Sequence, residues 1–323
     1  EFSTNFMSYL QKQICIRDFS IQKVDDKKLQ KLLDIFIEPK LTTDEIEEDK
    51  RTKEKNLKTK KFSIDKLEKI ETNILLSGEQ GVGKTKILNT LACRLSNPQT
   101  IFDNQQIPIK LKALDLRENN FNIEESIQKI IKHYSNQFFD DESIKKYKII
   151  PFIDDFDLLK SSEKTELKDE LKKYCDNNST HFVITYSKSE ISYDDSIKTI
   201  KIHNFNIKQI ESFIEKFFEG TGRAEKFIQI LKESDILSKL PTTPLTISLI
   251  SLLYDENNFE IPATLSDIYT DFTNVLLGKL EVYSKTELLI YNLKRRIFTS
   301  LALKMLDERI FEISLDDFKT FVN

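Results

Sequence analysis

One eight-residue stretch constrains the fold of this chain more than any other, and it reads Gly78-Glu79-Gln80-Gly81-Val82-Gly83-Lys84-Thr85. It fits the pattern G-x-x-x-x-G-K-[ST], and it lies between the apolar run Ile74–Leu76 and a segment of helical character. The glycines let the backbone curl so that successive N–H groups point inward, toward phosphate oxygens. A glycine-rich strand–helix turn without a ligand is the alternative. The length and context of the pattern favour binding of a nucleoside triphosphate.

The loop also predicts individual roles for its residues. Lys84 is expected to reach the outer phosphates, and the Thr85 hydroxyl is expected to hold Mg²⁺. The helix that follows directs its positive N-terminus at the same phosphates. We therefore expect ATP or ADP, with Mg²⁺, as cofactors, and the residues predicted to contact the nucleotide are Gly78, Glu79, Gln80, Gly81, Val82, Gly83, Lys84, Thr85 and Lys86.

Acidic residues follow a second apolar run. Asp154 comes directly after residues 149–153, where the carboxyl edge of a sheet would meet the phosphates. Its carboxylate, with Thr85, would complete the metal shell, largely through water. Asp155 and Asp157 come next, and three such acids repel one another unless a cation lies among them. A solvated turn is the alternative. We predict catalytic roles for Lys84, Asp154, Asp155 and Asp157.

A third strand is expected over Phe182–Thr185, and it ends in Tyr186-Ser187-Lys188. Lys188 at this position would contact the terminal phosphate and report whether it is present, so we include it among the catalytic candidates. Polar residues are common at strand ends, which is the alternative explanation.

Apolar strands and helices alternate between residues 72 and 204. This pattern predicts an α/β domain with a parallel sheet buried on both faces by helices. From residue 205 onward, apolar residues recur at helical spacing, and Thr243 and Pro244 suit the N-cap and first position of a helix. Residues 1–71 are expected to form an N-terminal helical and linker segment, in which the charged run 44–61 is a solvated linker or an exposed helix.

Composition limits the partners. The chain of 323 residues has a net charge of −4, which gives no reason to expect a nucleic-acid partner. No apolar run approaches the ~18 residues that a membrane span needs. Cys15, Cys93 and Cys175 lie far apart in the sequence, in no metal-ligand spacing. We therefore expect reduced thiols and a cytoplasmic location, with no membrane partner.

From about Thr72 to its end the chain resembles the STAND class of P-loop NTPases, and within it the NACHT family. The segments that carry the resemblance are GEQGVGKT, FIDDFD, TYSK, LPTTPLTISLI and IPATLSDIYTDF. The family has a small residue where this chain has Asp155, an acid where it has Leu158, and an arginine where it has Lys188. These departures imply slow hydrolysis, while nucleotide binding is retained.

The resemblance implies a P-loop domain over 72–204, a small helical domain over 205–284 and the truncated start of a winged-helix domain over 285–323. Pro244 would pack near the adenine. The implied function is a slowly hydrolysing ATP-binding signalling switch, which controls the conformation and oligomerisation of an effector in antiviral or innate immune defence. Effector and sensor domains would be missing from this chain, and the full-length protein would self-associate on activation.

Two other functions stay open. One is an AAA-type DNA-handling ATPase, such as a replication initiator or loader. The other is a nucleotide-bound scaffold with negligible turnover, for which Leu158 and Lys188 would be the cause.

Overall fold

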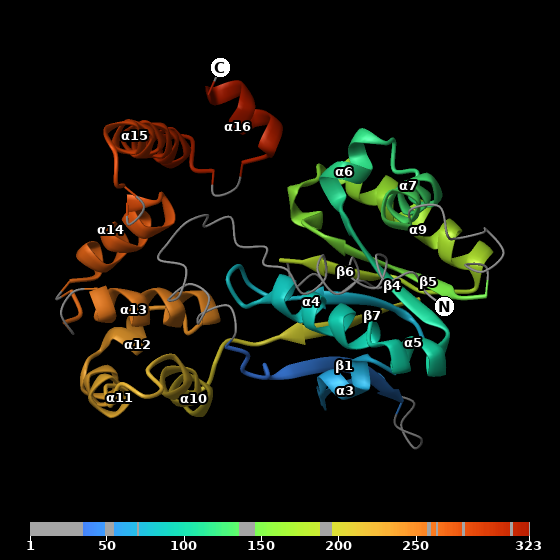
Figure 1. The fold of residues 1–323 in the computed structure, drawn as a ribbon, viewed down its shortest axis with the longest axis horizontal. Helices are drawn as coiled ribbons and strands as arrows, with labels where there is room; N and C mark the ends of the chain where they lie inside the picture. The colour runs from blue at the N-terminus through green and yellow to red at the C-terminus, as the bar shows by residue number, and fades with distance from the viewer. Residues whose placement is uncertain are drawn as a thin grey trace. The chain divides into compact units, whose positions relative to one another are not determined.

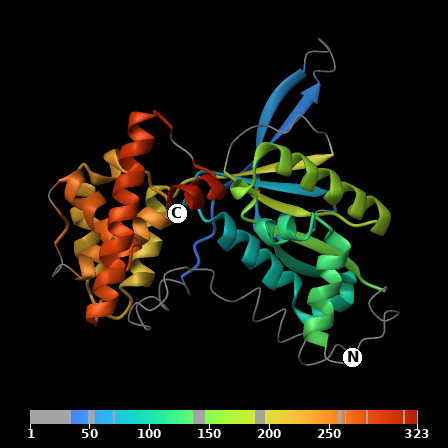
Figure 2. The ribbon, with the colours of Figure 1, turned by 90° about the horizontal axis from the view of Figure 1, so that it is seen from above.

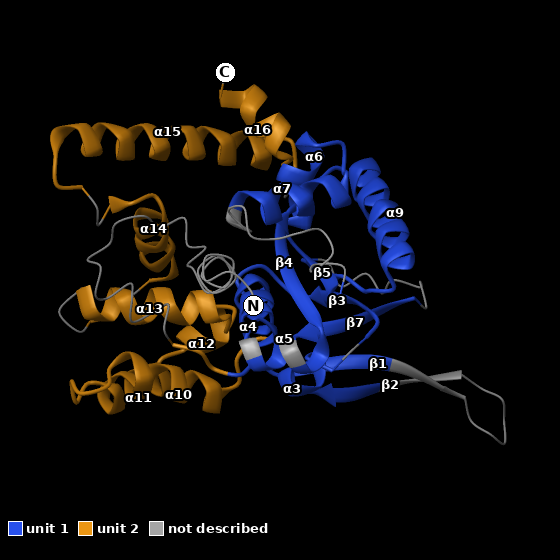
Figure 3. Ribbon diagram, turned by 45° about the vertical axis from the view of Figure 1, so that its right-hand side comes forward, with its two compact units in different colours: residues 1–17, 38–203 blue, residues 18–37, 204–323 orange. Residues whose placement is uncertain are grey.

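The computed structural model describes residues 35–48, 55–69, 71–135, 146–187, 196–256, 260–262, 264–279, 282–310 and 313–322. The chain divides into two compact units (Figure 3). Among the described residues, unit 1 runs from Glu38 to His203, and unit 2 comprises residues 35–37 and the chain from Asn204 onward. Residues 1–34 of the expected N-terminal helical and linker segment lie outside the described residues.

Unit 1 is built on a seven-stranded sheet with the order β2-β1-β7-β3-β6-β5-β4 (Figure 1). Its core strands, from β7 through β3, β6 and β5 to β4, all pair in parallel, as the alternating sequence predicts. β1 is antiparallel to β7, and β2 is antiparallel to β1. The sheet is therefore mixed, which corrects the expectation of a parallel sheet. The strands are β1 (Leu41–Glu48), β2 (Lys55–Phe62), β3 (Asn73–Ser77), β4 (Gln106–Lys112), β5 (Lys148–Asp154), β6 (Val183–Tyr186) and β7 (Ile197–Ile202).

The expectation of a linker or exposed helix over residues 44–61 is wrong, because β1 and β2 form a hairpin here. Leu41 is buried and pairs with Ile202 of β7, which gives the hairpin its place in the sheet. The Asp44 carboxylate accepts a hydrogen bond from Thr59 (2.7 Å) and pairs with Lys201 (2.9 Å). The charged run has no alternation of apolar and polar residues, and the strand that pairs with β1, β7, lies more than a hundred residues away in the chain. The local sequence pattern therefore did not predict the hairpin.

Helices flank this sheet (Figure 2). They are α3 (Ile64–Leu67), α4 (Lys84–Leu95), α5 (Pro98–Asn104), α6 (Ala113–Glu118), α7 (Ile123–Ser135) and α9 (Ser161–Asn178), with a 3₁₀ turn, η1 (Phe156–Leu158). On α4, apolar residues recur every three or four positions and all are buried, which fixes the helix on the sheet. These are Ile87, Leu88, Leu91, Ala92 and Leu95.

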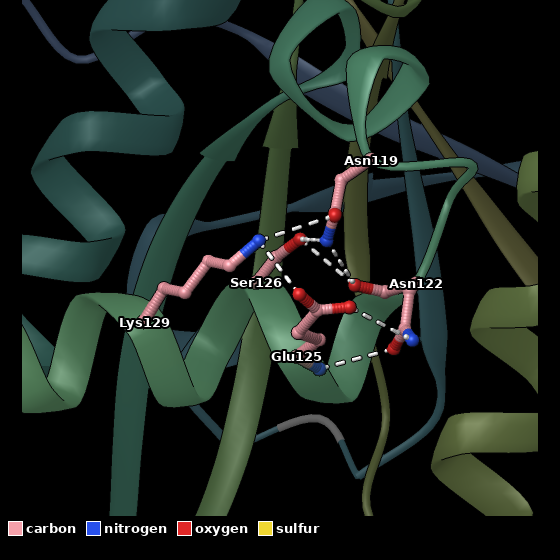
Figure 4. A network of polar contacts seen from close by, with 5 residues as sticks. All are labelled: Asn119, Asn122, Glu125, Ser126 and Lys129. Atoms are coloured by element: carbon pink, nitrogen blue, oxygen red, sulfur yellow. Dashed lines mark hydrogen bonds and ion pairs between the residues drawn. The ribbon is translucent and has the colours of Figure 1, made fainter.

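A polar network closes the turn between α6 and α7 (Figure 4). The Asn122 side chain accepts the N–H of Glu125 (3.0 Å), and the Lys129 ammonium binds both the Glu125 carboxylate (2.7 Å) and the Asn119 side chain (3.2 Å). Ser126 donates to the Asn122 carbonyl (2.8 Å). These bonds hold the turn over residues 119–122, which follows α6. The helix α6 in turn contacts η1.

All the regular elements in the described part of unit 2 are helices, as the spacing after residue 205 predicts. Its elements are α10 (Ile207–Phe217), α11 (Ala224–Glu233), α12 (Ile236–Lys239), α13 (Pro244–Glu256), α14 (Leu265–Leu276), α15 (Lys285–Asp307) and α16 (Leu315–Val322). The core centres on stacked Phe227 and Tyr254, whose ring centroids are 4.3 Å apart. Thr243 caps α13 through the N–H of Thr246 (3.1 Å), and Pro244 is the first helical residue, as predicted.

The predicted winged-helix start over residues 285–323 contains α15 and α16, and no strand occurs in its described part. That assignment stays a prediction. None of the described helices is long and apolar enough to cross a membrane. Cys175 is a buried free thiol, whose pKa burial raises to about 12.

Candidate nucleotide and metal site

The site follows from the strand order. In the sheet β6 lies between β3 and β5, and all three strands are parallel. Their carboxyl ends therefore meet at one edge, which is where open α/β sheets bind ligands. Gly78 follows β3, Asp154 ends β5, and Ser187 follows β6. The structure brings the glycine-rich loop, the acidic turn and the end of β6 together at this edge.

The loop has the backbone geometry that its sequence predicts. Gly81 and Gly83 have φ of 82° and 93°, in the left-handed region that glycine adopts without strain. Gly78 is needed for a different reason. A Cβ on it would lie 2.8 Å from Cγ1 of Val82 and 3.0 Å from the carbonyl oxygen of Ile202. The Gly78 N–H donates to the carbonyl of Tyr186 (3.2 Å), which joins the start of the loop to the end of β6.

Lys84 begins α4, and its side chain folds back over the loop. Its ammonium donates to the carbonyls of Gly78 (2.9 Å) and Glu79 (3.2 Å) and to the Ser187 hydroxyl (3.0 Å). Burial lowers the pKa of Lys84, while the carboxylates of Asp157 and Asp154 act in the opposite direction. A phosphate would give this half-buried cation an anionic hydrogen-bond partner in place of neutral carbonyls.

Asp154 contacts the first turn of α4. It is buried, and its Oδ1 accepts hydrogen bonds from the hydroxyls of Thr85 (3.2 Å) and Thr185 (2.8 Å). Its Oδ2 lies 3.6 Å from the ammonium of Lys110, which is also largely buried. The sequence analysis missed Lys110 and Thr185. A cation inside the apolar strand Ile107–Leu111 was the available signal for Lys110.

The Thr85 hydroxyl and the Asp154 carboxylate are adjacent hard oxygen ligands, which suit Mg²⁺. No cluster of three His, Cys, Asp or Glu residues that could hold a metal occurs among the described residues. An ion bound here would take its remaining ligands from phosphates and water, as Mg²⁺ usually does. The donor set therefore fits a nucleotide-bound Mg²⁺ and does not fit a metal held by protein alone.

The other two acids have separate positions. Both carboxylate oxygens of Asp157 accept hydrogen bonds from Ser187, one from its N–H (2.8 Å) and one from its hydroxyl (2.5 Å). Asp155 has φ of 60°, an uncommon conformation for a residue other than glycine, and its carbonyl accepts the N–H of Leu158 (3.0 Å) to start η1.

For two further residues, a place in the site stays a prediction. Pro244 lies in unit 2, and its contact with adenine stays a prediction. Lys188 lies outside the described residues. The structure thus assembles Lys84, Thr85, Asp154 and Asp157, with Ser187 and Lys110 added to them.

A glycine-rich loop between a parallel strand and a helix, with a buried aspartate at the next-but-one strand end, defines a P-loop nucleotide-binding protein. The comparisons with known proteins narrow this class. The family model for the ATPase family associated with various cellular activities (AAA) matches residues 74–235, which is half of the chain. The chain belongs to the AAA family, and membership implies ATP binding. The narrower NACHT expectation receives no support from these comparisons.

Several solved structures also match this chain. PCH-2 of C. elegans is 15% identical with a TM-score of 0.38, and the match covers 67% of this chain and 64% of that chain. Domain III of the Thermotoga maritima replication initiation protein DnaA is 16% identical (TM-score 0.36, covering 66% and 89%). A RuvB variant of Thermotoga maritima is 13% identical (TM-score 0.35, covering 80% and 78%). These values are too low to say what this chain acts on. No curated protein matches the sequence.

Proposed function

We propose that this protein is a Mg²⁺-dependent ATPase whose nucleotide site is the loop Gly78–Thr85 with the carboxylate of Asp154. The observation that carries the proposal is the hydrogen bond between Thr85 and Asp154, which places a hydroxyl and a buried carboxylate together behind the phosphate loop. Mg²⁺, when bound, would be held by these two side chains and would neutralise charge on the phosphates.

The remaining residues have distinct tasks in this proposal. The loop N–H groups and the Lys84 ammonium bind phosphate oxygens, for which Lys84 leaves the carbonyls of Gly78 and Glu79. Asp157 holds Ser187, and so fixes the end of β6 beside Lys84. We assign the orientation of the attacking water to Asp155, because it directly follows Asp154 and its left-handed backbone is the kind of strain that functional sites store.

Phosphate release from the purified protein tests the proposal, with Asp155→Asn as the informative variant. Wild-type protein should release phosphate from ATP in the presence of Mg²⁺. Asp155→Asn should slow release about a hundredfold or more, and should bind ATP with unchanged affinity. A variant that hydrolyses ATP at the wild-type rate would show that Asp155 does not orient the water. A wild-type protein that binds no nucleotide would refute the whole assignment.

Two proposals describe the function that ATP binding and hydrolysis would serve in this protein. The motif resemblance supports a STAND-type switch, in which ATP and ADP favour different conformations, because a ligand shifts an equilibrium only through differential affinity. The AAA family match supports the broader class that includes DNA-handling ATPases, although the net charge of −4 gives no electrostatic reason for DNA binding. An antiviral or innate immune role rests on the motif resemblance alone.

The same phosphate-release assay separates these functions when double-stranded and single-stranded DNA are added. Stimulation by DNA supports a DNA-handling ATPase. Slow release that DNA leaves unchanged supports the switch, and nucleotide binding without release supports the scaffold.

We also propose that nucleotide state controls self-association, and that the chain is a monomer with ADP. Light scattering with ADP and with a non-hydrolysable ATP analogue tests both statements. A stable oligomer that forms regardless of nucleotide would contradict this part of the proposal.

A further inference from the structure

Lys110 lies in an unusual position for a lysine. It is in the interior of β4, its side chain is only 9% exposed, and its ammonium lies 3.6 Å from Oδ2 of Asp154, whose side chain is 4% exposed. A buried lysine requires a compensating anion, because burial of an isolated ammonium costs several kcal/mol. Asp154 is the carboxylate that the proposed function gives to the metal.

The sheet register builds this pair into the fold. β4 and β5 are adjacent parallel strands (Figure 3), and the register sets Lys110 opposite Phe152 and Lys112 opposite Asp154. Residues two apart on a strand share a face, so Lys110 and Asp154 lie diagonally on the same face of the sheet. A one-residue slip would move Lys110 to the other face.

Asp154 has two chemically different sides. Its Oδ1 faces the hydroxyls of Thr85 and Thr185, and its Oδ2 faces the ammonium of Lys110. A cation on the Oδ2 side reduces the negative potential that would attract Mg²⁺ to the Oδ1 side. When no metal is present, the Asp154 carboxylate repels the phosphates of a nucleotide in the loop. The same cation reduces this repulsion.

We propose that Lys110 is a built-in counterion of Asp154 that weakens Mg²⁺ binding and strengthens metal-free nucleotide binding. Lys110 is thus a positioning residue that acts through Asp154, and it makes the site retain nucleotide when Mg²⁺ is scarce. This inference rests on the proposed nucleotide site. It goes beyond that proposal because it concerns how strongly Mg²⁺ binding and nucleotide binding are coupled.

The test is a titration of ADP affinity against Mg²⁺ concentration by calorimetry, with no turnover involved. In Lys110→Met, the Mg²⁺ concentration that gives half-maximal tightening of ADP should fall about tenfold or more, and ADP affinity in EDTA should fall by a similar factor. Lys110→Arg keeps the charge and should behave as wild type. Lys173→Met removes an exposed cation of α9, away from Asp154, and should change neither quantity by more than about twofold.

The first change means that Mg²⁺ binds more tightly, and the second means that ADP binds more weakly. Loss of a purely structural lysine would weaken both kinds of binding together. Unchanged or parallel effects in folded Lys110→Met would therefore overturn the proposal. If Lys110→Met does not fold, Lys110→Gln is judged by the same criterion, because it keeps a hydrogen-bond donor without the charge. Failure of the wild-type protein to bind ADP under any condition would instead refute the nucleotide site, so the two failures are distinguishable.

Discussion

Ser187 donates two hydrogen bonds to Asp157, from its N–H (2.8 Å) and from its hydroxyl (2.5 Å). The two residues lie thirty positions apart, on η1 and at the end of β6, and the Ser187 hydroxyl also accepts a hydrogen bond from Lys84 (3.0 Å). Asp157 therefore acts on Lys84 through a serine. The catalytic role that the sequence analysis gives to Asp157 stays a prediction.

Asp157→Asn replaces one acceptor oxygen by an amide nitrogen, so one of the two bonds from Ser187 loses its acceptor. We expect a loss of about 1–2 kcal/mol in the free energy of unfolding, measured with urea, together with slower phosphate release. The Mg²⁺ dependence of ADP binding should be retained, because the bonds of Asp157 go to Ser187 and not to Thr85. Ser187→Ala should reproduce the slower release. Equal loss of Mg²⁺ dependence in Asp157→Asn and Asp154→Asn would contradict this division of roles.

Asp154→Asn should remove the tightening of ADP binding by Mg²⁺, as calorimetry would show. It should also destabilise the protein by about 3–5 kcal/mol, because it leaves the buried ammonium of Lys110 without its carboxylate. The double variant with Lys110→Met should be more stable than the sum of the two single losses predicts, since the second substitution removes the stranded charge. Simple additivity would show that the two side chains do not interact energetically.

Lys84→Ala should abolish ATP binding while it changes the free energy of unfolding by less than about 1 kcal/mol. The reason is that burial lowers the pKa of Lys84 and its partners in the nucleotide-free protein include neutral carbonyls, so the charge stabilises the fold little. Lys173→Ala, at an exposed lysine of α9, is the control and should bind ATP normally. Wild-type affinity of Lys84→Ala in calorimetry would remove this loop from the site.

Gly78→Ala should destabilise the protein by about 1–3 kcal/mol in urea denaturation, because the new methyl group would overlap Val82 Cγ1 and the carbonyl of Ile202. The cost should be smaller in a Val82→Ala background, where one of the two clashing atoms is gone. An alanine variant as stable as wild type would show that the loop can move away from β7.

His181 should make the protein acid-sensitive. Burial lowers its pKa to about 4, to which Lys148 contributes while Glu71 opposes the shift. Below about pH 6.5 the unfolded chain takes up a proton that the folded protein does not bind, so stability falls as the pH falls and the loss is complete near pH 4. At about pH 5 we expect about 2 kcal/mol less stability than at neutral pH from this group. His181→Asn should flatten that slope in urea titrations, and an unchanged slope would contradict the assignment.

The sequence by itself determined the elements whose residues are contiguous. The motif Gly78–Thr85 predicted the strand before it, the turn and the helix after it, because a glycine-rich loop of this kind is a local structure. Asp154 was predicted because it ends a single apolar run that forms one strand. The capped start of α13 at Thr243 and Pro244 is equally local. The parallel core also followed from the alternation of apolar strands and helices, because that connection permits few other sheets.

Only the tertiary structure decided which residues from distant parts of the chain meet. Leu41 pairs with Ile202, Lys110 faces Asp154, and Ser187 binds Asp157, and each pair joins residues that lie on different strands or turns far apart in the chain. A charged residue in a sequence has the same appearance whether it is solvated or paired. Its role depends on strand order and register, which arise from packing of the whole sheet and not from its own neighbours.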